Sequence, residues 1–212
     1  MTWQRARSDE QIEQRIGEIL DASAKLYQAH RFEEITFAMI AKESNFTRSN
    51  LYRYFKTKED IFLKLLAHDI SMWREDIQDN LPEPESSPHD FAKRWVALLS
   101  KRRRMLQLFA ILYTILEKNA SLEALIEFKK SIQAELNIAI AMMVSFLPAL
   151  TPEKASEFLQ ASLSLSIGIH PLMDLTEKQK EAMTKVGMPY SAAQYQAVWE
   201  HSIESLLRGL IS

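Results

Sequence analysis

Hydrophobic residues recur every three or four positions along most of the chain, and polar or charged residues fill the positions between them. This spacing is the period of an α-helix that buries one face. A clear example lies in residues 10–30, where the apolar positions are Ile12, Ile16, Ile19, Leu20, Leu26 and Tyr27. The pattern predicts a long amphipathic helix over this segment.

Two short helical segments follow, at about residues 37–43 and 48–54, and the tripeptide Ser44-Asn45-Phe46 separates them. A much longer helix is expected to begin at Thr57. Thr47 and Thr57 are placed to cap the last two helices, and an aspartate three residues after Thr57 completes a variant of the capping box. The N-terminal part of the chain is therefore predicted to contain helices in the order long, short, short, long.

Prolines divide the rest of the chain into further helices. Three prolines between residues 81 and 88 predict a loop, because proline inside a helix removes a hydrogen bond and clashes with the preceding turn. Two or three packed helices are expected over 89–147, one helix over 153–169, a short helix with flanking loops within 172–190, and a last helix over 192–210. With only four glycines in 212 residues, the chain is predicted to be all-α.

The composition is that of a globular protein with a substantial core, since 47% of the residues are hydrophobic and 25% are charged. There is no cysteine, which excludes a disulfide framework, a thiolate metal site and a thiol nucleophile. The first residues lack the apolar stretch of a signal peptide, and no apolar run reaches the roughly 18 residues of a membrane helix. A soluble, cytoplasmic protein without a membrane partner is expected.

The net charge of −2 argues by itself against binding to nucleic acid, because DNA-binding modules usually have a basic surface. The charge is unevenly distributed, however. Residues 42–58 contain five cations and one anion, namely Lys42, Arg48, Arg53, Lys56 and Lys58 against Glu43. The basic surface that DNA binding needs is confined to this segment.

Residues 36–59 have the pattern of a helix-turn-helix corner. Two helices packed at a steep angle need apolar contacts on both helices and at the turn, and the chain supplies Ile40, Ala41, Phe46, Leu51 and Phe55. Asn45 lies where the turn needs a left-handed backbone, which asparagine tolerates best after glycine.

Once Leu51 and Phe55 point inward, the second short helix has a polar outer face, formed by Arg48, Ser49, Tyr52 and Arg53. Arginine can donate to guanine edges or to phosphates, and the hydroxyl groups can bond to phosphates. This face is therefore predicted to read DNA in the major groove.

The residues Ile40-Ala41, Phe46-Thr47 and Leu51-Tyr-Arg-Tyr-Phe-Lys-Thr-Lys-Glu59 closely resemble the pattern IA, VS and LYxYFxxKE of the TetR family. The resemblance is specific over about residues 10–65 and concerns only the helical plan beyond them. The chain departs from the family at His30 or Arg31 and at Asn45, where a glycine is common. Both corners are then formed by residues with less conformational freedom.

The resemblance implies an N-terminal three-helix DNA-binding domain in residues 1–58, a fourth helix that links it to about residue 80, and a C-terminal bundle in residues 59–212 for dimerisation and effector binding. It also assigns phosphate or backbone contacts to the residues at 36, 54 and 58, and groove contacts to those at 47–50 and 52. With the two exposed arginines included, the predicted DNA-binding residues are Thr36, Thr47, Arg48, Ser49, Asn50, Tyr52, Arg53, Tyr54 and Lys58.

The partners expected from this architecture are double-stranded operator DNA, a second copy of the chain and a small-molecule effector. In a homodimer the two recognition helices would enter successive major grooves about 34 Å apart on a near-palindromic operator. An apolar or amphipathic effector bound among the helices of residues 89–169 would release the protein from DNA by a shift in population. The expected function is that of a repressor, and an activator or an effector-independent regulator is the alternative.

The C-terminal region contains candidates for both the effector pocket and the dimer interface. Methionine and aromatic side chains make adaptable apolar walls, and the pocket candidates are Trp95, Phe109, Tyr113, Phe128, Met142 and Met143. The helices at 153–169 and 192–210 match in placement the pair that forms a four-helix dimer interface in the TetR family, with candidate contacts Leu159, Leu163, Ile167, Tyr195, Trp199 and Ile203. Packing within one protomer explains both patterns equally well.

Other chemistry has little support in the sequence. The five histidines have no metal-ligand spacing, and there is no glycine-rich phosphate loop, so neither a metal nor a cofactor is expected. A helical enzyme or a signalling adaptor that keeps the helix-turn-helix as structure is the alternative from another class. It would need a catalytic cluster that the sequence does not contain, so no enzymatic activity is expected. The basic run at 101–104 is interpreted as solvated charge.

Overall fold

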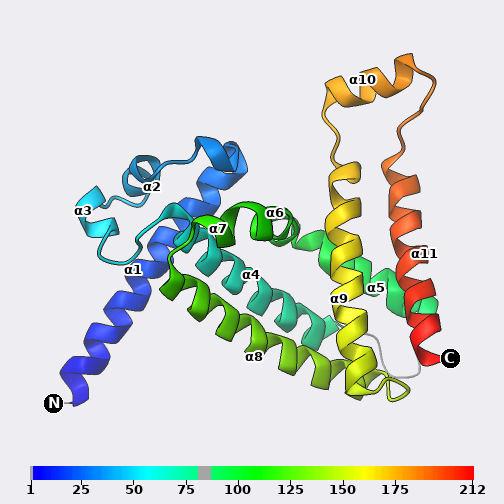
Figure 1. Cartoon of the computed structure of the whole chain (residues 1–212), viewed down its shortest axis with the longest axis horizontal. Helices are drawn as coiled ribbons and strands as arrows, with labels where there is room; N and C mark the ends of the chain where they lie inside the picture. Colours follow the sequence, from blue (N-terminus) through cyan, green and yellow to red (C-terminus); the bar gives the residue numbers. More distant parts are fainter. Residues whose placement is uncertain (1, 81–86) are drawn as a thin grey trace. The chain divides into compact units, whose positions relative to one another are not determined.

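The computed structural model describes the backbone of residues 2–80 and 87–212 and the side chains from residue 10 onward in the same ranges. It confirms the all-α prediction, because 83% of the chain is helical and the described residues contain no strand. The elements, in the order shown in Figure 1, are α1 (Thr2–Ala29), η1 (Phe32–Glu34), α2 (Phe37–Glu43), α3 (Arg48–Leu51), α4 (Lys58–Asn80), α5 (Pro88–Lys101), α6 (Arg103–Ile111), η2 (Leu112–Leu116), α7 (Glu117–Asn119), α8 (Leu122–Phe146), α9 (Pro152–Ile169), η3 (His170–Met173), α10 (Glu177–Lys185) and α11 (Ala192–Ile211).

Most of the predicted elements are present, with two differences. The second short helix ends at Leu51 instead of residue 54, because Arg53 N and Tyr54 N donate to carbonyls three residues back and tighten the chain into turns. The segment 89–147 is divided more finely than expected, and it includes a π-helical turn, η2, and the short helix α7. The predicted loop at 81–88 lies largely outside the described residues.

The chain forms two compact units, which we call the head unit (residues 1–68 and 111–131) and the body unit (residues 69–110 and 132–212). Helices α4 and α8 each continue from one unit into the other. None of the described helices combines the length and the apolar character that a membrane span requires.

The core of the head unit is built around Phe62 of α4, which is fully buried. The rings of Tyr27 and Phe32 meet it edge-on, with centroids 5.5 and 5.0 Å from that of Phe62. Burial, together with the nearby carboxylate of Glu33, raises the pKa of Tyr27 to about 12. Helix α1 is thereby packed on α4 behind the two short helices.

The core of the body unit is centred on Trp95 of α5, which is fully buried. Its ring packs against Trp73 of α4, Phe91 of its own helix and Phe158 of α9, at centroid distances of 5.2 to 5.7 Å. On α11, Trp199 Nε1 donates to the buried Oγ of Ser166 on α9 at 3.0 Å. Aromatic packing and this hydrogen bond hold α5, α9 and α11 together.

The basic run at 101–104 is more deeply engaged than the sequence suggested. Arg102 Nε donates to Asp76 at 2.6 Å and its Nη2 to the carbonyl of Met72, while Arg104 donates through two nitrogens to Asp69 at 2.8 and 2.6 Å. Arg103 pairs with Asp174. The expectation of solvated charge is thus wrong for Arg102 and Arg104, because α4 places two acids opposite them.

Candidate nucleic-acid interface

Helices α2 and α3 are each started by a threonine N-cap. The Thr36 side chain accepts from Met39 N at 3.3 Å, and the Thr47 side chain accepts from Asn50 N at 3.2 Å. Asn45, between the helices, has φ 57°, which is the left-handed conformation that the sequence predicted for the turn. Local hydrogen bonds and one permissive residue therefore define the helix-turn-helix backbone.

Buried apolar residues fix the corner between α2 and α3. Ile40, Ala41, Leu51 and Phe55 are all buried, and Ile40 and Leu51 are fully so. Phe46 is only half-buried, and its ring meets that of Tyr54 edge-on at 6.3 Å. Four of the five predicted corner residues thus form the core of the motif, and the fifth lies at its edge.

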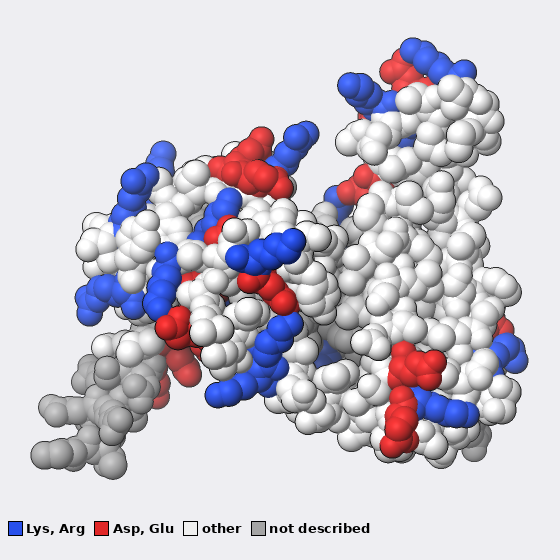
Figure 2. Space-filling view, in the orientation of Figure 1, with Lys and Arg blue, Asp and Glu red and all other residues white. Residues whose placement is uncertain are grey.

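The face of α3 opposite this core is exposed and polar. Arg48, Ser49, Asn50 and Arg53 are exposed, and among the described residues neither arginine has an acidic partner. Figure 2 shows Lys and Arg side chains gathered on the surface over α2 and α3. Guanidinium groups that have no acidic partner in the described part of the chain are available to phosphates and base edges.

Tyr52 is 59% exposed, and its ring stacks on Phe37 of α2 with a centroid distance of 4.7 Å and an interplanar angle of 17°. The stacking fixes the direction of the phenol, so that its hydroxyl is presented to solvent at a defined place. Because the ring also supports α2, Tyr52→Phe tests the hydroxyl alone, whereas Tyr52→Ala removes the stacking as well.

Lys58 has a structural role that the sequence did not reveal. Its Nζ donates to the carbonyls of Phe32 and Ile35 at 2.8 and 2.9 Å and lies 4.3 Å from the centroid of the Phe32 ring. These contacts tie the start of α4 to the connection between α1 and α2. An ammonium has three N–H donors, so one remains for a phosphate.

Lys58→Ala is expected to lower the free energy of unfolding by about 2 kcal/mol, because two carbonyl groups lose a charged donor. Urea denaturation followed by circular dichroism measures this. The control is Lys42→Ala, which removes an exposed cation on α2 and should change stability by less than about 0.5 kcal/mol. Equal stability of the two variants would show that the Lys58 contacts contribute nothing to the fold.

The six predicted effector residues are divided between the two compact units. Trp95, Phe109, Met142 and Met143 belong to the body unit, and Tyr113 and Phe128 belong to the head unit. Trp95, Phe128 and Met143 are buried, whereas Tyr113, in the π-helical turn η2, is 67% exposed with Lys129 Nζ 5.4 Å from its ring centroid. Within the body unit, Trp73 Nε1, Trp95 Nε1 and Ser100 Oγ are buried, and no described residue forms a hydrogen bond with them.

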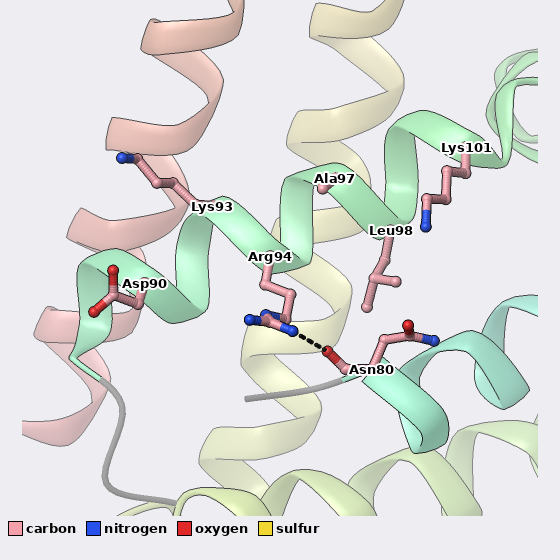
Figure 3. Close-up of a pocket in the computed structure, with 7 residues that line it drawn as sticks. All are labelled: Asn80, Asp90, Lys93, Arg94, Ala97, Leu98 and Lys101. Carbon is pink, nitrogen blue, oxygen red and sulfur yellow. Dashed lines mark hydrogen bonds between the residues drawn. The ribbon is translucent and has the colours of Figure 1, made fainter. Parts of the chain in front are cut away.

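A hollow of about 600 Å³ lies between the end of α4 and α5, and none of the six predicted effector residues lines it. Its lining is mainly polar and basic, and consists of Asn80, Asp90, Lys93, Arg94, Ala97, Leu98 and Lys101. Figure 3 shows Arg94 and Lys101 pointing to the same side of α5 as Leu98, and Arg94 Nη1 donates to the carbonyl of Asn80 at 3.5 Å. This hollow is chemically unlike the apolar pocket that the sequence predicted.

Of the predicted dimer contacts, Leu159, Trp199 and Ile203 are buried within the body unit of one protomer. Leu163, Ile167 and Tyr195 are half-buried. The sequence analysis missed a further signal, because residues 158–173 and 186–199 contain no Lys, Arg, Asp or Glu. Figure 2 shows an uncharged surface over the C-terminal part of α9 and the N-terminal part of α11. The exposed residues of these two segments include Gln160, Ser164, Gly168, Ala197 and Val198.

Across residues 10–80 and 87–212, no three His, Asp or Glu side chains are grouped so that they could hold a metal ion.

Comparison with known proteins gives matches over both parts of the chain. Residues 19–65 match the family of bacterial regulatory proteins described as the tetR family, and residues 67–212 match the tetracyclin repressor-like C-terminal domain. The HTH-type transcriptional regulator QacR of Staphylococcus aureus is 37% identical over 57 residues, which are 27% of this chain and 30% of that protein. The sequence match to this relative therefore covers less than a third of its length.

Solved structures with the same fold extend over nearly the whole chain. A TetR transcriptional regulator from Rhodococcus sp. RHA1 has a TM-score of 0.59 at 16% identity and covers 95% of this chain and 99% of its own. The regulator FadR from Bacillus subtilis, solved in complex with stearoyl-CoA, has a TM-score of 0.52 at 16% identity and covers 89% and 97%. At 16% identity, the similarity to these two structures shows a shared fold and nothing more specific.

Proposed function

The chain belongs to the TetR family of bacterial transcriptional regulators, and we propose that it is a repressor that binds operator DNA and is released by a small molecule. The observation that carries the proposal is the exposed face of α3 and of the turn after it, where Arg48 and Arg53 have no acidic partner among the described residues. We assign DNA binding to residues 1–58 and dimerisation and effector binding to residues 59–212. Helix α4 links the two parts as far as about residue 80. Such a protein would act in the cytoplasm, where the DNA is.

The proposed contacts to DNA follow the geometry of the motif. Arg48, Ser49, Asn50 and Tyr52 face the major groove, and Thr47 at the N-cap of α3 lies beside it. Arg53 contacts a phosphate or a guanine edge. Further contacts to the DNA backbone come from residues around this face, namely Thr36, Tyr54 and the remaining donor of Lys58.

A homodimer would place two copies of α3 in successive major grooves. The uncharged surface over α9 and α11 supports an interface there, because the cores of protein interfaces are depleted of charged residues. Leu163, Ile167 and Tyr195 are half-buried and would contact the partner. Leu159, Trp199 and Ile203 would support this surface from inside the protomer.

Gly168→Arg tests the interface. A Cβ added at Gly168 meets no atom within 4 Å, so the protomer tolerates the substitution, whereas a charge buried in a dimer interface does not find a partner. The variant is expected to sediment as a folded monomer and to lose specific operator binding. Ala134→Arg, at an exposed position of α8, is the charge-matched control and should remain dimeric. If the Gly168→Arg variant remained dimeric, the dimer interface would have to lie on another surface.

The effector is proposed to bind in the body unit, and its class is apolar or amphipathic. Two indole N–H groups and one hydroxyl that are buried without partners support a ligand with acceptor oxygens, because such groups are costly to leave unpaired. FadR, which has the same fold, was solved in complex with stearoyl-CoA, so this fold can bind a ligand with a long apolar chain. An activator or an effector-independent regulator has the same DNA-binding surface.

Fluorescence anisotropy of the purified protein with its own upstream intergenic DNA tests the proposal, with random duplex as competitor and salt as a variable. Specific binding that weakens steeply with salt is expected. Absence of binding even at low salt would contradict DNA binding and favour a helical adaptor or enzyme that keeps the motif as structure. The same assay then serves to screen effectors.

A further inference from the structure

Asp60, in the first turn of α4, is a buried carboxylate with an unusually complete set of hydrogen bonds. It is 4% exposed. It accepts from Lys56 N at 3.0 Å, from Thr57 N at 3.2 Å and from Thr57 Oγ1 at 3.0 Å. It also accepts from Ser121 N at 2.7 Å and from Ser121 Oγ at 3.1 Å. The roughly four acceptor sites of a carboxylate are thus all used.

These donors come from two places that are far apart in the sequence. Lys56 and Thr57 belong to the loop that leaves α3, between its end at Leu51 and the start of α4 at Lys58. Ser121 lies immediately before α8, and its Oγ accepts from Ala124 N at 3.3 Å. One buried side chain therefore holds the exit of the DNA-reading element and the start of α8 at the same point.

Two ion pairs extend this contact, one from the loop before α4 and one from α4 itself, both to α8. Lys56 Nζ lies 2.9 Å from Glu123, and Lys64 Nζ lies 2.5 Å from Glu127. The hydrogen bond from Lys56 lowers the pKa of Glu123 below its usual value. Both pairs are exposed and contribute little energy, so the buried Asp60 network is the strong element of the contact.

We propose that Asp60 is a positioning residue for operator recognition, which holds the loop after α3 against the first turn of α8. The inference rests on the proposed DNA-binding function. Both partners belong to the head unit, so a displacement of Ser121 before the first turn of α8 would act through Asp60 on the loop of Lys56 and Thr57.

The test compares specific with nonspecific DNA affinity in Asp60→Asn, Ser121→Ala and Ser121→Thr, at a temperature where circular dichroism and sedimentation show folded dimer. Asp60→Asn keeps the volume of the side chain but replaces one acceptor oxygen by an amide NH2 group, which then faces N–H and O–H donors. It should weaken operator binding tenfold or more. Its affinity for random duplex should change by less than threefold, because no DNA-facing cation is altered. Ser121→Ala should weaken operator binding about threefold, and Ser121→Thr, which keeps the hydroxyl, should restore it.

A matched control is Asp79→Asn, which removes an exposed carboxylate of the same helix and should leave both affinities unchanged. Wild-type operator affinity in Asp60→Asn, or equal losses of specific and nonspecific affinity, would overturn the positioning role. If Asp60→Asn does not fold, the Ser121→Ala and Ser121→Thr pair decides the question. Failure of the wild type itself to bind operator specifically would instead contradict the proposed function.

Discussion

Replacing Arg48 or Arg53 by alanine is expected to weaken operator binding by about 30-fold or more. Arg48 is exposed on α3 and Arg53 is exposed in the turn after it, and neither has an acidic partner among the described residues. Replacement of either one should therefore remove the proposed DNA contact without breaking an internal ion pair. A contact to a base or a phosphate contributes about 1–3 kcal/mol. The proposed homodimer would lose two copies of the contact, and a total of about 2 kcal/mol corresponds to about 30-fold in affinity.

Anisotropy titrations at several salt concentrations also identify the kind of contact. Loss of a phosphate contact lowers the salt slope by about one unit per protomer and affects all sequences equally, whereas loss of a base contact relaxes specificity at one operator position. Lys178→Ala, an exposed cation of α10 in the body unit, is the control and should bind like the wild type. If both arginine variants bound the operator with wild-type affinity, α3 would not be part of the DNA-binding surface.

A large loss of folding stability is expected when the ion pair of Asp69 and Arg104 in the body unit is broken. Asp69 is buried and receives two hydrogen bonds from the Arg104 guanidinium. Arg104→Ala leaves this carboxylate without its charged donor, and the free energy of unfolding should fall by about 3–5 kcal/mol. The double variant Asp69→Leu/Arg104→Met should be much less destabilised, because it removes both charges and fills the space.

Urea denaturation at one fixed protein concentration measures these differences, since the stability of a dimer depends on concentration. The comparison variant is Arg208→Ala, whose ion pair with Glu204 is exposed on the arginine side and should contribute less than about 1 kcal/mol. If Arg104→Ala and Arg208→Ala lose the same stability, the Asp69 pair does not hold the start of α6 to α4.

Residues 36–60 show which features could be predicted from the sequence. Thr47 and Thr57 act as caps as predicted, and the capping box at Thr57 is present, with Asp60 N donating to Thr57 Oγ1 at 3.1 Å and Thr57 N donating to Asp60 at 3.2 Å. The left-handed Asn45 was predicted as well. Each of these interactions joins residues no more than four positions apart, so the local sequence contains all the participants.

Burial along α9 and α11 could be predicted only in part. The apolar stripes correctly indicated helices, and Leu159, Trp199 and Ile203 turned out to face the interior of the body unit. A stripe has the same period whether it packs within a protomer or against a second copy. Only the position of each helix against its neighbours, such as the Trp199–Ser166 hydrogen bond between α11 and α9, decides which residues remain for a partner.

By itself the sequence determined the all-α fold, the helix-turn-helix and its polar outer face, because helix period, capping and turn chemistry act over a few residues. Only the tertiary structure decided the roles of Lys58, which reaches carbonyls 23 and 26 positions away, and of Asp60, which meets Ser121 61 positions along the chain. It also decided that Arg102 and Arg104 are paired with acids of α4. A charged side chain can bond to any complementary group that the fold brings within about 3 Å, and its sequence neighbours do not contain that information.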